Sequence, residues 1–94
     1  MIRSVVVIKA RDGHDSGRMA EILAALEAMV VPGRIGFWTG ADLGLRPGNW
    51  DYTLVADLES AEAYRAYDAD PEHNRLRAEL APLVDQIVRS QIEI

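Results

Sequence analysis

The chain has 94 residues, of which 49% are hydrophobic, and a formal net charge of −5. This length predicts one domain over residues 1–94, with a small core. The absence of cysteine excludes a disulfide framework and thiol chemistry. Basic residues lie among acidic ones, which argues against binding to nucleic acids or anionic membranes. Neither a signal peptide nor an apolar run of membrane-spanning length is visible, so we expect a cytoplasmic protein.

The first third of the chain predicts a strand followed by a helix. Residues 2–9 are rich in Val and Ile, and apolar residues occur on both faces of the predicted strand, which indicates a strand covered on both sides. A turn follows at residues 12–17. The apolar residues of the next segment recur at helical spacing: Met19, Ile22, Leu23, Leu26, and Met29 or Val30. Pro32 and Gly33 are expected to end this helix.

The rest of the chain predicts two strands, a pair of helices and a last strand. The strands are residues 34–43 and 50–58, joined by a loop at 45–49. Ser60 is a candidate N-cap for a helix over 61–67. Asp70 and Pro71 are typical of the N-cap and first residue of another helix, whose end Pro82 disturbs. Its apolar side is predicted to be Leu76, Leu80, Leu83, Val84 and Ile87. Residues 88–94 form the last strand.

This order, β-α-β-β-α(α)-β, is the split βαβ pattern of the ferredoxin-like α+β fold with an antiparallel sheet. Helices cover one face of such a sheet. The other face would carry a set of apolar side chains: Val5, Val7, Val55, Val88, Ile92 and Ile94. A patch of this kind is rarely left in water, so we expect a homodimer that packs two such faces together.

Stretches from the first strand, the third strand and the helical region resemble one family. The stretches are MIRSVVVIK (1–9), DYTLVADLES (51–60) and YRAYDADPEH (64–73). The last is similar to the Tyr followed by His-Pro-x-His of the stress-responsive dimeric α/β-barrel (Dabb) family. The resemblance extends over essentially the whole chain and keeps the order of its elements.

The resemblance implies a dimeric α/β barrel with a pocket between sheet and helices in each subunit. Many members have no assigned activity, and some are named for stress responses. One plant member cyclises a linear polyketide by an intramolecular aldol reaction without a cofactor, using a Tyr and a His that correspond by position to Tyr67 and His73. This chain departs from the family at Ser4 and Asp70, where many members have His, and at Leu54, where the cyclase has a pocket His.

From the residues themselves, Tyr67 would close one helix and His73 would lie in the first turn of the next. Both side chains could then converge on an apolar cavity under the sheet, the usual form of a small-molecule site. His suits acid–base chemistry near neutral pH, and Tyr can donate a hydrogen bond to a developing oxyanion. The predicted lining is Ser4, Val6, Ile8, Ile22, Leu23, Leu26, Leu54, Ala56 and Leu76, with Ile87 as a further candidate. Arg89 is either a residue of the pocket mouth that would hold an anionic ligand or an edge-strand side chain in solvent.

Several alternatives stay open. In the simpler interpretation, His73 caps or packs at the start of its helix, and Tyr67 is a core residue whose hydroxyl reaches the surface. A helix N-terminus disfavours the imidazolium of His73, whereas Asp68, Asp70 and Glu72 favour it. The functional hypotheses are a cofactor-independent cyclase or aldol-type enzyme acting on a polyketide-like or phenolic compound, a non-catalytic stress-response or ligand-binding dimer, and a cofactor-free monooxygenase. No metal-ligand spacing is visible, and the expected partners are a second copy and a hydrophobic small molecule.

Overall fold

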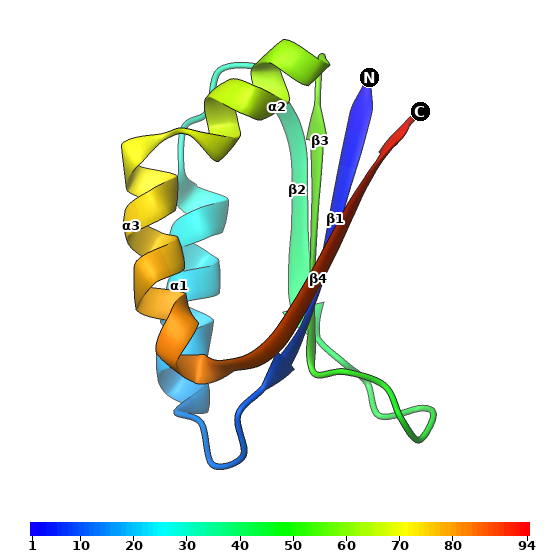
Figure 1. Cartoon of the computed structure of the whole chain (residues 1–94), viewed down its shortest axis with the longest axis vertical. Helices are drawn as coiled ribbons and strands as arrows, with labels where there is room; N and C mark the ends of the chain where they lie inside the picture. Colours follow the sequence, from blue (N-terminus) through cyan, green and yellow to red (C-terminus); the bar gives the residue numbers. More distant parts are fainter.

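The computed structural model describes residues 1–94 and has four strands in one sheet, in the order β2-β3-β1-β4, with every neighbouring pair antiparallel (Figure 1). The elements are β1 (Ile2–Ala10), α1 (Ser16–Ala28), β2 (Arg34–Ala41), β3 (Tyr52–Leu58), α2 (Ala61–Asp68), α3 (Pro71–Leu80), a 3-10 turn (Ala81–Leu83) and β4 (Val84–Glu93). This arrangement confirms the predicted ferredoxin-like fold.

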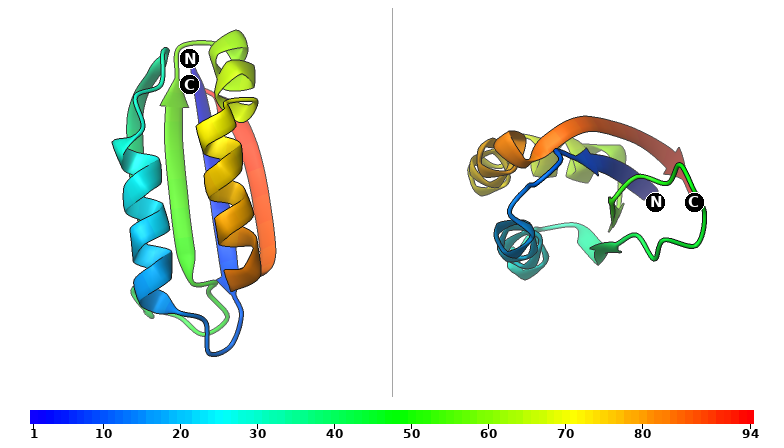
Figure 2. Two further views of the ribbon diagram at one scale, coloured as in Figure 1. Left: turned by 90° about the vertical axis from the view of Figure 1, so that its left-hand side faces the viewer. Right: turned by 90° about the horizontal axis from the view of Figure 1, so that it is seen from below.

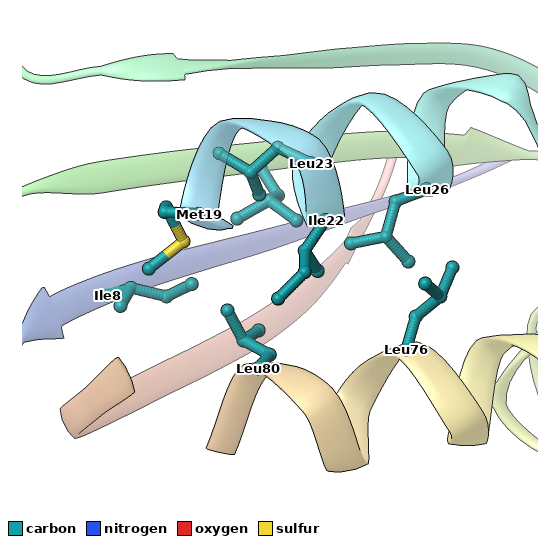
Figure 3. Packing of buried hydrophobic residues seen from close by; sticks show 8 residues of the cluster. Ile8, Met19, Ile22, Leu23, Leu26, Leu76 and Leu80 are labelled. Atoms are coloured by element: carbon teal, nitrogen blue, oxygen red, sulfur yellow. The ribbon is translucent and has the colours of Figure 1, made fainter. Parts of the chain in front are cut away.

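The three helices lie on one face of the sheet, and the other face is bare (Figures 1 and 2). Side chains of β1 alternate, so that Ser4, Ile8 and Ala10 are buried on the helical side. The main core lies where α1 and α3 meet the sheet (Figure 3). Its buried members are Ile8, Met19, Ile22, Leu23, Leu26, Leu54, Leu76 and Leu80.

The helix starts follow the local rules that the sequence indicated. The Ser60 hydroxyl accepts a hydrogen bond from the Ala63 backbone N–H at 3.1 Å. One Asp70 carboxylate oxygen accepts bonds from the backbone N–H groups of Glu72 (2.9 Å) and His73 (3.1 Å). Pro71 then occupies the first turn, where its missing N–H costs nothing. Asp70 and Pro71 together separate α2 from α3 at a fixed point in the chain.

Two predicted helix ends were wrong. The helix α1 stops at Ala28, before Pro32 and Gly33, and Val30 is 96% exposed. The reason is a distant residue: the Arg34 guanidinium donates to the backbone carbonyls of Leu26 (2.9 Å), Glu27 (2.9 Å) and Met29 (3.1 Å). These bonds satisfy the carbonyls that a longer helix would have used.

The second error concerns the end of α3. This helix stops at Leu80, because Pro82 lacks an N–H and only a 3-10 turn continues the chain. Val84 and Ile87, expected on the helix, belong to β4 instead. The backbone N–H of Arg11 fixes this junction by donating to the Leu83 carbonyl at 2.9 Å. The strands β2 and β3 are each two residues shorter than predicted at the end that meets their connecting loop.

The bare face, which we call the open face, carries the apolar side chains that the sequence placed there. The register sets Val5 beside Val55, and Val7 beside Val88. Trp38 is 55% exposed on this face, and its indole lies across Gly36, where a Cβ atom would come within 2.5 Å of the ring. Arg3 and Asp57 form a two-pronged ion pair, at 2.8 and 2.9 Å, that neutralises both charges within the apolar surface.

No helix is both long enough and apolar enough to cross a membrane.

We expect Asp70→Ala to lower the free energy of unfolding by about 1 kcal/mol, because two backbone N–H groups at the start of α3 lose their acceptor. Chemical denaturation followed by circular dichroism measures the change. Asp70→Asn keeps an acceptor oxygen and should recover most of the loss. Equal destabilisation by both variants would contradict a capping role.

Candidate functional site

A cavity of about 70 Å³ lies between the sheet and the helices. Its interior is formed by apolar side chains from all four strands, α1 and α3, and its polar groups come from α2, α3, β1 and β4. The complete lining is Ser4, Val6, Ile8, Leu26, Phe37, Leu54, Ala56, Tyr64, Tyr67, His73, Arg77, Leu80, Ile87 and Arg89.

The structure brings most of the sequence-predicted lining together at this cavity. The predicted residues found there are Ser4, Val6, Ile8, Leu26, Leu54 and Ala56, with Tyr67, His73, Ile87 and Arg89. Ile22, Leu23 and Leu76 do not line it. They are buried in the core where α1 and α3 meet the sheet (Figure 3).

The rings of Tyr67 and His73 stack in parallel, with centroids 4.1 Å apart and planes 15° apart. Tyr67 lies in the last turn of α2 and His73 in the first turn of α3. Pro71 and the Asp70 cap redirect the chain between them, so two residues six positions apart become face-to-face neighbours. The same turn places the His73 Nδ1 atom 2.9 Å from the Tyr67 backbone carbonyl.

This hydrogen bond sets the tautomer of His73. A carbonyl oxygen only accepts, so Nδ1 must carry the proton. In the neutral ring, the lone pair then lies on Nε2. No protein group bonds to Nε2, and no fully buried side-chain nitrogen or oxygen lacks a partner, so Nε2 keeps accessible surface. His73 therefore has one anchored nitrogen and one nitrogen free to take a proton.

Burial lowers the pKa of His73 from its ordinary value, and the Arg77 guanidinium lowers it further. The bond to the Tyr67 carbonyl and the carboxylates of Asp68 and Asp70 act in the opposite direction without overcoming these effects. The imidazole is thus neutral at pH 7. Burial and the Arg77 guanidinium on α3 therefore outweigh the nearby carboxylates, whose balance with the helix N-terminus the sequence left open.

Burial raises the pKa of the Tyr67 hydroxyl, although Arg34 and Arg77 oppose the shift. The phenol therefore keeps its proton throughout the neutral range and can act as a hydrogen-bond donor. Neutral His73 and protonated Tyr67 together offer one acceptor and one donor in an apolar surrounding.

Two guanidinium groups, those of Arg77 and Arg89, also line the cavity. Arg77 pairs with the Asp68 carboxylate and donates to the Asn74 side-chain oxygen at 3.3 Å. On the opposite wall, the Gln91 amide donates to the Ser4 hydroxyl at 3.2 Å. No group of three or more His, Asp or Glu side chains is arranged to hold a metal ion.

Sequence reasoning missed four lining residues: Phe37, Tyr64, Arg77 and Leu80. Helical spacing could have found two of them, since Tyr64 lies one turn before Tyr67 and Arg77 one turn after His73. Phe37 lies opposite Ala56 in the sheet, so only the strand register identifies it.

The comparisons with known proteins agree with this architecture. A dimeric ferredoxin-like protein of unknown function from Thermobifida fusca is 31% identical, with a TM-score of 0.88 over 99% of this chain and 90% of that one. A dimeric ferredoxin-like protein from Jannaschia sp. is 20% identical, with a TM-score of 0.87 over 99% and 98%. The hydroxynitrile lyase of Passiflora edulis is 17% identical, with a TM-score of 0.86 over 99% and 92%.

Comparison with curated protein sequences finds no match. The family model described as Stress responsive A/B Barrel Domain matches residues 2–93, which is almost the entire chain. The chain therefore belongs to the stress-responsive A/B barrel domain family.

Proposed function

We propose that this protein is a homodimeric acid–base enzyme that acts on a small apolar carbonyl or phenolic compound. The observation that carries the proposal is the tautomer of His73. Its Nδ1–H is held by the Tyr67 carbonyl, which leaves a basic Nε2 in a ring that lines the cavity. A base of this kind needs no partner carboxylate to fix its orientation.

The chemistry that fits is enolisation followed by an intramolecular aldol step. Nε2 of His73 takes a proton from the carbon next to a carbonyl, and the C–H electron pair moves into the enolate. The Tyr67 hydroxyl donates a hydrogen bond to the oxyanion. The enolate carbon then forms a C–C bond to a second carbonyl of the same molecule, and the proton held by His73 passes to the new alkoxide. Electrons and protons balance without an oxidant or reductant.

The homodimer is supported by the open face and by the relatives. The structure from Thermobifida fusca, which is 31% identical, is described as dimeric. Packing two open faces together would cover Trp38, Val88 and Ile92, each of which is more than half exposed in the single chain. The Arg3–Asp57 pair would enter the interface already neutralised.

A non-catalytic ligand-binding dimer is the second candidate. It is favoured by the lining itself, in which 10 of the 14 residues are hydrophobic. A small apolar cavity with a few polar groups serves binding as well as catalysis. The two functions differ in whether a bound ketone exchanges its protons.

The first test is therefore hydrogen–deuterium exchange at the α-carbon of aliphatic and aryl methyl ketones in D₂O, followed by NMR. The protein should accelerate the exchange. His73→Gln should reduce the acceleration about 10²–10⁴-fold by removing the base, and Tyr67→Phe should reduce it to a smaller extent by removing the oxyanion donor. Trp50→Phe, outside the cavity, serves as the control. Binding of the ketones without any accelerated exchange would favour the non-catalytic dimer.

The exchange rate should also depend on pH in a defined direction. The base must be unprotonated, so the rate rises as pH increases through the pKa of His73. Because burial and Arg77 lower that pKa, the midpoint should lie below the ordinary value of 6.5. Arg77→Gln removes a nearby positive charge and should move the midpoint upward. A midpoint that Arg77→Gln leaves unchanged would exclude His73 as the titrating base.

Sedimentation velocity tests the dimer. Ile92→Lys places an ammonium on the open face and should shift the protein toward the monomer, because a charge without a partner is costly in an apolar interface. Val30→Lys changes an equally apolar but fully exposed side chain away from the sheet and should leave the mass unchanged. A dimer that tolerates Ile92→Lys would argue for a different interface.

A further inference from the structure

Arg89 stands apart from the other cationic residues of the chain. It lies on β4 opposite Val6, on the helical side of the sheet, and lines the cavity. It takes part in no ion pair and no side-chain hydrogen bond within the protein. A guanidinium without a protein partner beside an apolar cavity is available to a ligand.

The other arginines show how unusual this is. Arg3, Arg18, Arg75 and Arg77 are paired with carboxylates. Arg11 and Arg34 donate to backbone carbonyls. The two other arginines with no such partner, Arg46 and Arg65, lie outside the cavity. Arg89 is thus the unpaired cation of the cavity wall.

The neighbours of Arg89 on the same face of β4 form a gradient of polarity. Ile87, two residues before it, is apolar and lines the cavity, whereas Gln91, two residues after it, donates to Ser4. These residues lie opposite Ile8, Val6 and Ser4 of β1 in turn. A ligand along this strip would meet an apolar surface, then a positive charge, then hydrogen-bonding groups.

The charged side chains that line the cavity are all positive. Arg77 and Arg89 contribute two positive charges to the lining, which contains no carboxylate. Asp68, outside the lining, pairs with Arg77, and the charge of Arg89 also helps to lower its pKa. His73 is neutral there. The cavity therefore has a net positive rim in a chain whose net charge is −5.

We propose that the cavity selects compounds that carry a carboxylate, with the apolar part of the ligand inside and the carboxylate bound by Arg89. A guanidinium can bind a carboxylate through two parallel hydrogen bonds, which gives both strength and orientation. Arg77 supports the binding through its charge but keeps its bond to Asp68. This inference rests on one part of the proposed function, namely that the cavity binds a small molecule. It names the class of that molecule as an apolar carboxylic acid.

Matched acids and amides of equal size test this inference. We would titrate the protein with hexanoate and hexanamide, and with benzoate and benzamide, and measure the dissociation constants by NMR. Each acid should bind at least about tenfold more tightly than its amide, because a charge-assisted bond adds about 1.4 kcal/mol or more. High salt should weaken binding of the acids and leave the amides unchanged.

Variants then assign the selectivity to Arg89. Arg89→Gln should abolish the difference between acid and amide without weakening amide binding, and Arg89→Lys should recover part of it. Arg46→Gln makes the same charge change in an exposed loop residue and should retain the full difference. Equal affinity for acid and amide, or a preference that survives Arg89→Gln, would overturn the inference.

These outcomes separate the inference from the acid–base proposal. Acid-selective binding with no ketone exchange would support Arg89 and refute catalysis by His73. Ketone exchange without any preference for acids would support catalysis by His73 and refute carboxylate binding by Arg89.

Discussion

The break between α2 and α3 determines the candidate site. The Asp70 carboxylate holds the first N–H groups of α3, Pro71 prevents continuation of α2, and the turn between them brings His73 back to the Tyr67 carbonyl. A continuous helix would place residues six positions apart on different faces, more than one turn from each other. Here the two rings stack at 4.1 Å. Every chemical property attributed to the pair depends on this turn.

Burial and charge act on the pair in a consistent way. Low polarity keeps His73 neutral and Tyr67 protonated, which is the combination that an enolising site requires. The cationic groups lie on α3 and β4, at the polar side of the same cavity. Arg77 connects the two regions, because its guanidinium both lowers the pKa of His73 and pairs with Asp68. In the function that we propose, Arg77 would therefore link the proton-transfer pair to the cationic side of the cavity.

Local features of the sequence were sufficient to predict much of the fold. Ser60 and Asp70 were identified as caps because capping depends on a side chain and the N–H groups two or three residues later. Strand alternation placed Ser4, Val6 and Ile8 under the helices. By contrast, the end of α1 is set by Arg34, and the sequence around Ala28 contains no sign of this. This contact accompanies the early end of α1, whereas the end of α3 follows from Pro82, whose effect reaches further back along the helix than predicted.

The same distinction applies to the site. The position of Tyr67 and His73 at the cavity was expected from local spacing and the family resemblance, although their chemical roles remain a proposal. The pKa of His73 was not predictable, because it depends on burial and on Arg77 rather than on the neighbouring carboxylates alone. Ile22, Leu23 and Leu76 show the converse: helical spacing identifies apolar residues but does not distinguish a cavity wall from a packed core.

The indole of Trp38, which approaches Gly36 closely on the open face, gives the protein an optical label at the surface where we propose that two subunits meet. In a separate subunit the ring is exposed beside the Arg3 guanidinium, whose carbon lies 5.9 Å from the ring centroid. Transfer into an apolar interface would shift its fluorescence emission to shorter wavelength. The glycine that leaves room for this ring thus makes subunit association visible without an added dye.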